Sequence, residues 1–355
     1  MAYSNVDKSS LFQNNVLYTG NGTAIGSGGQ AITGVGFSAD FTWLKERSST
    51  SGHHWFDTPR GATEKISSDS TAAESANAET LASWQSDGFT VGSAGGANQS
   101  GQTYVAWNWK AGTTSGLSGG TITPSAYSIN TTTKFGVYKY TGNGTSGATI
   151  AHGLGVAPKF LLTKKISATG DWHVAHQYNS AYPWNSYLYL NSTDATQEEN
   201  SATWFLNDTA PDATNITLGN GAGINGSGVD YVIYAWAPVT GYSSFGQYKG
   251  TGNADGTFVY TGFKPSFVLI KRYAGGTGNW WLWDNKREGY NEVNDNLYPD
   301  LTNAEDTSGR AINILSSGFK CINTDTGVNG DGSYYIYTAF GQPIVGSNGV
   351  VGTAR

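Results

Sequence analysis

The sequence predicts an all-β protein made of three tandem β-sandwich repeats, each of roughly 100 to 115 residues. One stretch occurs three times, at residues 36–45, 155–164 and 262–271: a turn containing Gly, an apolar run and a lysine. In each copy a phenylalanine lies four residues before the lysine, so spacing is repeated along with composition. Aromatic residues alternate along short segments, and Gly-Asn or Asn-Gly pairs follow them, as in β-hairpins.

The composition indicates the same class. With 49 Gly and only 13% charged residues, the chain needs many turns and has few long surface helices. Its 12 Trp, 21 Tyr and 14 Phe supply apolar area that a disordered chain would leave in water. A length of 355 residues suits two or three domains, and the repeat favours three.

Each repeat is expected to open with a half-buried strand that turns back tightly. Residues 135–143 and 245–253 carry this pattern, and the first repeat keeps it at 18–22. A short return strand, at 257–260 in the third copy, leads into the apolar run of the repeated stretch, which we call the organising strand. Because residues 267–270 are all apolar, we expect this strand to lie centrally with both faces covered.

An aromatic strand follows the organising strand after a polar loop. It is clearest at residues 280–284, with counterparts at 54–57 and 172–175. On a strand, Trp280 and Trp281 must point to opposite faces. One of them is therefore expected to point outward or into a neighbouring unit.

An acid and a base lie three residues apart at the end of this strand in two copies. The pairs are Asp57 with Arg60 and Asp284 with Arg287, whereas the second copy lacks them. Such spacing at a strand end favours a local ion pair or turn cap. A clamp for a substrate carboxylate is the alternative.

The remaining elements complete each copy. Residues 71–84 of the first copy are rich in Ala and Glu and are compatible with a single short helix. The predicted later strands are 88–91, 216–218 and 318–321, and the predicted closing strands are 104–109, 231–236 and 335–340. Since apolar residues occupy alternate positions of the closing strands, each should present a continuous apolar face.

These patterns set the expected domain boundaries. The chain divides into a first repeat with an N-terminal attachment segment (1–112), a Gly/Ser/Thr linker (113–133), a second repeat (134–238), a third repeat (239–341) and a C-terminal arm (342–355).

Charge and cysteine content exclude several classes of protein. A net charge of -6 and the lack of a basic run argue against nucleic acid as a partner. The N-terminus lacks the apolar core of a signal peptide, and no apolar run is long enough to span a membrane, so synthesis in a cytoplasm is expected. With Cys321 alone, an internal disulfide and a site built from several thiolates are both impossible.

Catalytic and metal-binding patterns are weak throughout. His53 and His54 should diverge, as should His173 and His176, so neither pair chelates a metal unaided. His152 precedes a turn and suits a backbone cap, and Cys321 suits a small buried strand position. Residues 323–330 superficially resemble a calcium loop but lack its bidentate acid, which favours a turn.

Two acidic clusters raise the question of a glycosidase. Glu198 with Glu199, and Glu305 with Asp306, lie in polar loops where we expect no adjoining aromatic platform. This argues against that activity. The sequence therefore predicts no catalytic residues, no metal and no cofactor.

Tryptophan is the ambiguous residue type. Exposed aromatic rings beside amides can stack on sugars, whereas the same rings on alternate strand positions fill a core. Core packing is favoured. The candidate ligand-binding residues on the other interpretation are Trp280, Trp283, Asn279 and Asn285.

The motif order resembles a known repeat family. The motifs are Tyr-Thr-Gly-Asn-Gly, Gly-Phe-X-Pro-X-Phe-Val-X-Ile-Lys, Trp-X-X-X-Asp-Asn-Lys-Arg, Ser-X-Gly-Phe and Tyr-Ile-Tyr-X-Ala-Phe. Together they resemble uncharacterised domains found in virion structural and tail-fibre-like proteins of marine bacteriophages, over residues 7–355. The resemblance implies a place in a virus particle and supplies no catalytic residues.

The leading functional hypothesis is a non-enzymatic virion protein assembled in the host cytoplasm. A tail fibre or appendage with a rigid extended body that contacts the host surface is favoured, attached through residues 1–15 or the C-terminal arm. Its expected partners are other virion proteins and copies of itself, with a trimer favoured, and host surface polysaccharide. The alternatives are a capsid decoration or head-fibre protein, a glycan-binding receptor module and, least favoured, a polysaccharide-degrading tail enzyme.

Overall fold

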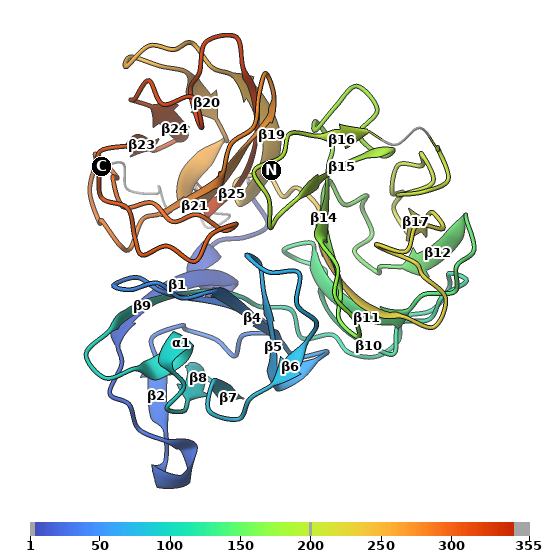
Figure 1. Ribbon diagram of the computed structural model, residues 1–355, viewed down its shortest axis with the longest axis horizontal. Helices are drawn as coiled ribbons and strands as arrows, with labels where there is room; N and C mark the ends of the chain where they lie inside the picture. Colours follow the sequence, from blue (N-terminus) through green and yellow to red (C-terminus); the bar gives the residue numbers. More distant parts are fainter. Residues whose placement is uncertain (1–3, 199–200, 344–355) are drawn as a thin grey trace.

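The computed structural model describes residues 4–198 and 201–343. Nearly all of its regular structure is β-strand, which confirms the predicted all-β class. The strands form sheets that gather into three lobes around a common centre (Figure 1).

The first repeat forms two main sheets with strand orders β1-β9-β3-β4-β5-β6 and β2-β8-β7. Its elements are η1 (Ser9–Leu11), β1 (Gln13–Thr19), η2 (Ile25–Ser27), β2 (Gln30–Thr33), β3 (Phe41–Glu46), β4 (His53–Asp57), β5 (Gly61–Ser67), β6 (Ser75–Ala76), β7 (Leu81–Gln85), β8 (Gly88–Val91), α1 (Gly95–Asn98) and β9 (Thr103–Trp109).

The second repeat forms sheets with strand orders β10-β11-β18-β13-β14-β15-β16 and β12-β17. Its strands are β10 (Ala126–Asn130), β11 (Phe135–Thr141), β12 (Ala148–Ala151), β13 (Phe160–Lys165), β14 (Trp172–His176), β15 (Ser186–Tyr189), β16 (Gln197–Glu198), β17 (Asn215–Leu218) and β18 (Asp230–Trp236).

The third repeat forms sheets with strand orders β19-β25-β21-β22 and β20-β24-β23. Its strands are β19 (Ser243–Lys249), β20 (Phe258–Tyr260), β21 (Phe263–Ala274), β22 (Trp280–Asp284), β23 (Ile312–Leu315), β24 (Gly318–Cys321) and β25 (Tyr334–Pro343).

One four-strand order recurs in the large sheets. Opening, closing, organising and aromatic strands lie side by side as β1-β9-β3-β4, then β11-β18-β13-β14, then β19-β25-β21-β22. The organising strands β3, β13 and β21 each pair on both sides, and their apolar runs are buried. Their predicted central position is confirmed, and its cause is that apolar residues at consecutive positions need cover on both faces of the sheet.

The closing strands divide their side chains between two cores. In β9, Tyr104 and Ala106 join a cluster that also holds residues of the small sheet β2-β8-β7. Their neighbours Val105, Trp107 and Trp109 point the other way, into a cluster that we call the central core. Strand alternation therefore gives each large sheet one apolar face for its own repeat and one for the centre.

The central core contains residues from all three repeats. Trp43, Trp55 and Trp107 of the first meet Trp172, Tyr234 and Trp236 of the second and Phe267, Trp280 and Phe340 of the third. Because the three large sheets are packed around one core, the repeats are not arranged end to end. The expected extended body is wrong, since the inward faces can be buried only against one another.

Three local predictions need correction or limits. No helix forms over residues 71–84, because β6 and β7 occupy part of this interval and Leu81 and Trp84 pack on the sheet. The expected linker 113–133 contains β10, which pairs with β11. The first two residues of the expected C-terminal arm end β25, and residues 344–355 lie outside the described part of the chain.

Candidate functional site

The lysines of the three organising strands tie neighbouring repeats together. Lys45, Lys164 and Lys271 are fully buried, and burial lowers the pKa of each to about 8. Each ammonium donates to a backbone carbonyl of another repeat: Lys164 Nζ to Thr71 at 3.0 Å, Lys271 Nζ to Ser192 at 2.9 Å and Lys45 Nζ to Thr302 at 3.3 Å. The contacts run from second to first, third to second and first to third repeat, which closes a ring.

The two Asp/Arg pairs are buried ion pairs and turn caps, as the local interpretation predicted. Asp57 and Arg60, like Asp284 and Arg287, meet at 2.6 Å with side chains that are 0% exposed. In each pair the aspartate also accepts the arginine backbone N–H, at 3.0 and 3.1 Å. Although burial opposes ionisation, Arg287 holds the pKa of Asp284 below its usual value. Neither pair is open to a substrate carboxylate.

These aspartates also join the repeats. Tyr234 Oη of the second repeat donates to Asp57 at 2.6 Å, and Trp107 Nε1 of the first donates to Asp284 at 2.9 Å. In the second repeat His176 stands at the position of Asp57 and Asp284. Its Nε2 lies 3.2 Å from the carbonyl oxygen of Tyr337 in the third repeat. At each boundary between two repeats, the last residue of the aromatic strand (Asp57, His176 or Asp284) thus makes a polar contact with the neighbouring repeat.

The other histidines and the cysteine are also structural. His152 Nδ1 accepts the Leu154 N–H at 3.1 Å, which confirms the predicted backbone cap. Burial lowers the pKa of His54 to about 3 and that of His173 to about 4, so both are neutral near pH 7. Cys321 is buried on β24, and burial raises its pKa to about 12. Within residues 4–198 and 201–343, no three His, Cys, Asp or Glu side chains are arranged to hold a metal ion.

The candidate ligand-binding residues do not form one surface. Trp280 belongs to the central core and donates through Nε1 to the Tyr189 carbonyl at 2.9 Å, whereas Trp283 lies in the third repeat's own core. Trp280 is 1% exposed and Trp283 is 0% exposed, so the favoured core packing is confirmed and neither ring is open to a ligand. Trp280 points into a neighbouring repeat, one of the two positions expected for a ring of this strand. Asn279 and Asn285 are partly exposed but line different hollows. The prediction that Trp280 and Trp281 face opposite sides is confirmed.

The acids at 305–306 do have aromatic neighbours, contrary to expectation. Tyr298 Oη donates to Asp306 at 2.6 Å, and Trp281 lines the same groove. Although burial acts in the other direction, hydrogen bonds from Ser308 and Tyr298 lower the pKa of Asp306 to about 2. Glu305 is held by Arg47 at 2.6 Å and by Arg287 at 2.9 Å. Asp306 pairs with Arg310 at 2.7 Å, so both carboxylates act as ion-pair partners here.

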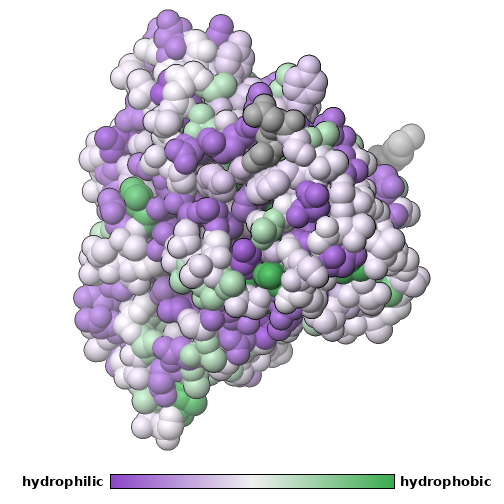
Figure 2. All heavy atoms as spheres, turned by 45° about the vertical axis from the view of Figure 1, so that its right-hand side comes forward, coloured by the Kyte–Doolittle hydropathy of each residue, from purple (hydrophilic) through white to green (hydrophobic). Residues whose placement is uncertain are grey.

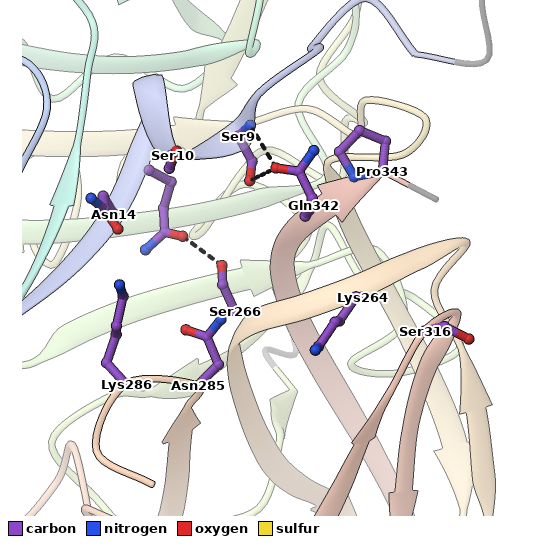
Figure 3. Close-up of a pocket in the computed structure, with 11 residues that line it drawn as sticks. Ser9, Ser10, Asn14, Lys264, Ser266, Asn285, Lys286, Ser316, Gln342 and Pro343 are labelled. Atoms are coloured by element: carbon purple, nitrogen blue, oxygen red, sulfur yellow. Dashed lines mark hydrogen bonds between the residues drawn. The ribbon is translucent and has the colours of Figure 1, made fainter. Parts of the chain in front are cut away.

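A polar recess lies where the two ends of the described chain meet, and we call it the terminal recess (Figure 3). Ser9 Oγ donates to Gln342 at 2.9 Å, and Ser266 Oγ donates to Gln13 at 2.8 Å. Lys264 and Lys286 lie on opposite sides of Ser266 and Asn285 in this view. The remaining lining residues are Ser10, Asn14, Ser316 and Pro343.

The terminal recess could not be found from sequence spacing. Ser9 and Gln342 are 333 residues apart, and neither lies in the repeated motif. Two ammonium groups beside serine hydroxyls and amides can bind an anionic group such as a carboxylate. The Oδ1 of Asn285 is buried and accepts no hydrogen bond among the described residues.

A protein-family model matches the chain over residues 8–343. Its description is domain of unknown function DUF7483. The chain belongs to this family. Neither the curated proteins nor the solved structures contain a match. The DUF7483 unit spans all three repeats, and therefore the whole of the central core.

One face of this DUF7483 protein is seen in a space-filling view. Figure 2 shows apolar side chains in small groups among hydrophilic ones on the face in view. In the described part of the chain, no helix has both the length and the apolar character needed to cross a bilayer.

Proposed function

We propose that this DUF7483 protein is a non-enzymatic structural component of a virus particle that contacts the host surface, a tail fibre or appendage component. The motif resemblance to phage virion proteins suggests the setting. The observation that carries the proposal is the central core, in which aromatic residues of three repeats and a ring of buried polar contacts form one body.

This architecture suits a protein that must persist outside a cell. With one cysteine the chain has no internal disulfide to constrain it, so burial and internal hydrogen bonds must supply its stability. Indole and phenol side chains bury the largest apolar areas per residue. In this body the histidines, the cysteine and the Asp/Arg pairs serve packing and cohesion.

The proposal assigns attachment to the terminal recess. Ser9 and Gln342, which belong to the two segments that the sequence offered for attachment, are hydrogen-bonded to each other there. A partner that presents a carboxylate to Lys286 would suit the polar lining of the recess. The compact body favours a knob or appendage domain over the shaft of a fibre, and a decoration on the capsid is the second candidate.

Immunogold labelling of purified particles with an antibody to this chain tests the proposal. Label on the tail supports an appendage, and label on the head supports the capsid decoration. Particles that contain no such chain by mass spectrometry would reject a virion role. A matched antibody against a host cytoplasmic protein controls for carry-over.

Assembly with copies of itself, with a trimer favoured, belongs to the same proposal. Native mass spectrometry of the purified chain should give three times its 37.6 kDa mass. A monomer at micromolar concentration would remove the trimer from the proposal. Incubation with polysaccharides should release no reducing ends, and release by the pure protein would contradict the non-enzymatic role.

A further inference from the structure

A second groove lies between the second and third repeats, where β16 approaches β19 (Figure 1). Its volume of about 580 Å³ is within the range of ligand sites. Its lining residues are Asn179, Ser180, Ala181, Thr196, Glu198, Gln247, Tyr273, Ala274 and Tyr334. We call it the boundary groove.

Two tyrosines form the aromatic part of its wall. The rings of Tyr273 and Tyr334 lie 6.2 Å apart and are inclined by 49°. Tyr334 is 42% exposed, whereas the next seven residues of its strand are buried. The ammonium of Lys249 lies 5.7 Å from the Tyr334 ring centre and helps to hold that ring in place.

Polar groups surround these rings. Gln247 Oε1 accepts the Tyr273 hydroxyl at 2.7 Å, which fixes both side chains. Asn179 is fully buried, yet its Oδ1 accepts no hydrogen bond among the described residues. The exposed Glu198 forms no ion pair within residues 4–198 and 201–343. The Glu198 carboxylate is therefore an acceptor that a hydroxyl-rich ligand can reach.

The two walls are fixed to each other. The Thr196 N–H of the second repeat donates to the Tyr273 carbonyl of the third at 3.1 Å. Gln177 Nε2 also crosses the boundary, to the Phe245 carbonyl at 2.6 Å. These bonds hold the two walls in place before a ligand binds. Binding therefore costs less conformational entropy than it would in a flexible site.

The other repeats show that the fold does not need tyrosine at position 334. Tyr334 is the first residue of the closing strand β25, and Thr103 and Asp230 begin the matching strands β9 and β18. A half-exposed aromatic ring thus stands where the other copies carry small polar or acidic side chains. This difference indicates a role at the surface that is particular to the boundary groove.

We propose that the boundary groove binds a neutral polysaccharide chain. The ring of Tyr334 would stack on the C–H face of a sugar, while the exposed Glu198 and Gln247 would bond its hydroxyls. A net charge of -6 and the carboxylate of Glu198 argue against an acidic glycan. This inference rests on the proposed function in one respect: it is the proposed function that names the host surface as the source of the glycan.

Affinity electrophoresis of the purified full-length chain tests the groove directly. Gels would contain galactomannan, mixed-linkage glucan, xylan or dextran, with alginate and dextran sulfate as acidic probes. We expect retardation in at least one neutral gel and none in the acidic gels. No retardation by any neutral polymer, or retardation by the acidic ones alone, would overturn the proposal.

Variants separate stacking in the groove from other effects. Tyr334→Ala should weaken binding about tenfold, whereas Tyr334→Phe, which keeps the ring, should leave it within about twofold. Glu198→Gln should weaken binding through the lost charge-assisted hydrogen bonds. Tyr260→Ala is the matched control, since Tyr260 is 63% exposed on β20 and does not line the groove.

Binding that is unchanged in Tyr334→Ala, or equally reduced in Tyr260→Ala, would refute this site. The assay uses purified protein, so loss of binding and absence of the chain from a virus particle are separate results. The glycan-binding proposal and the virion proposal can therefore be contradicted independently of each other.

Discussion

The hydroxyl of Tyr234 in the second repeat donates a 2.6 Å hydrogen bond to the buried carboxylate of Asp57 in the first. Arg60 binds the same carboxylate at 2.6 Å from within the first repeat. One acid therefore completes a turn in its own repeat and joins that repeat to its neighbour. The boundary is stabilised by polar contacts whose partners have no access to water.

Tyr234→Phe should lower the free energy of unfolding by about 1.5 to 3 kcal/mol. The substitution removes the hydroxyl donor and leaves the ring in the central core, while Asp57 loses one of its bonds. Guanidinium chloride unfolding measures the change. Tyr290→Phe, at a residue that is 68% exposed, is the control and should change stability by less than about 0.5 kcal/mol. Equal effects of the two changes would show that the contact contributes nothing.

Arg287→Met should destabilise the protein by about 3 to 5 kcal/mol, because it leaves Asp284 charged and buried without its main partner. The double variant Arg287→Met with Asp284→Asn should be less destabilised than the sum of the two single variants. Lys320→Met breaks a surface pair with Asp255 and should cost at most about 1 kcal/mol. Additive effects at Asp284 and Arg287 would contradict direct coupling.

Much of the fold followed from local pattern. The organising strands, the alternation of the closing strands and the Asp/Arg turn caps depend on residues a few positions apart, so their spacing was sufficient. The ring of lysine contacts was not accessible in this way. The repeated stretch shows that Lys45, Lys164 and Lys271 occupy equivalent positions. Their carbonyl partners lie in other repeats, and no sequence motif identifies those partners.

The choice between a solvent-exposed ring and a ring packed on a neighbouring repeat could not be made from the sequence for a related reason. Alternation correctly sent Trp280 and Trp281 to opposite faces, but it could not say that the third repeat has two buried faces. The face of β22 that points away from the third repeat's own core is covered by the other two repeats. Tyr273 and Tyr334 carry no motif either, and only the pairing of β21 with β25 brings them together.

Gly327→Ala should destabilise the protein by about 1 to 3 kcal/mol through overpacking. A Cβ atom at Gly327 would lie 2.6 Å from Nε1 of Trp281, which is buried beside it. The matching glycines of the other repeats, Gly96 and Gly223, face His54 and His173 in the same way, at 2.3 and 2.4 Å. Thermal unfolding is the measurement. Gly26→Ala, where a Cβ meets nothing within 4 Å, is the control, and an equal Tm for both variants would refute the packing argument.

Acid should destabilise the protein through its buried histidines. Burial lowers the pKa of His176 to about 3, below the value of about 6.5 in an unfolded chain. Between these values the unfolded state binds more protons, so the contribution of His176 is complete above about pH 6.5 and decreases as the pH falls. Its Nε2–H donates to Tyr337 O, and its Nδ1 accepts the Tyr178 N–H, so a second proton has no acceptor.

His176→Gln should reduce the pH dependence of stability between pH 5 and 6 by about 1.4 kcal/mol per unit. Denaturant unfolding in buffers across this interval measures the slope. Tyr178→Phe is the neighbouring control and should leave the slope unchanged, since it keeps the backbone N–H that His176 Nδ1 accepts. An unchanged slope in His176→Gln would mean that the imidazole is protonated equally in both states.

The third repeat should not fold as a stable monomer on its own. Expressed as residues 239–343, it would expose Phe267, Ile336 and Phe340, which are 1 to 2% exposed in the whole chain because the other repeats cover them. An uncovered apolar face of this kind favours association or loss of fixed packing. We expect broad amide resonances and no sharp thermal transition, whereas the complete chain should unfold in one cooperative step. A monodisperse, folded third repeat with its own transition would show that the central core joins independent domains and does not stabilise each of them.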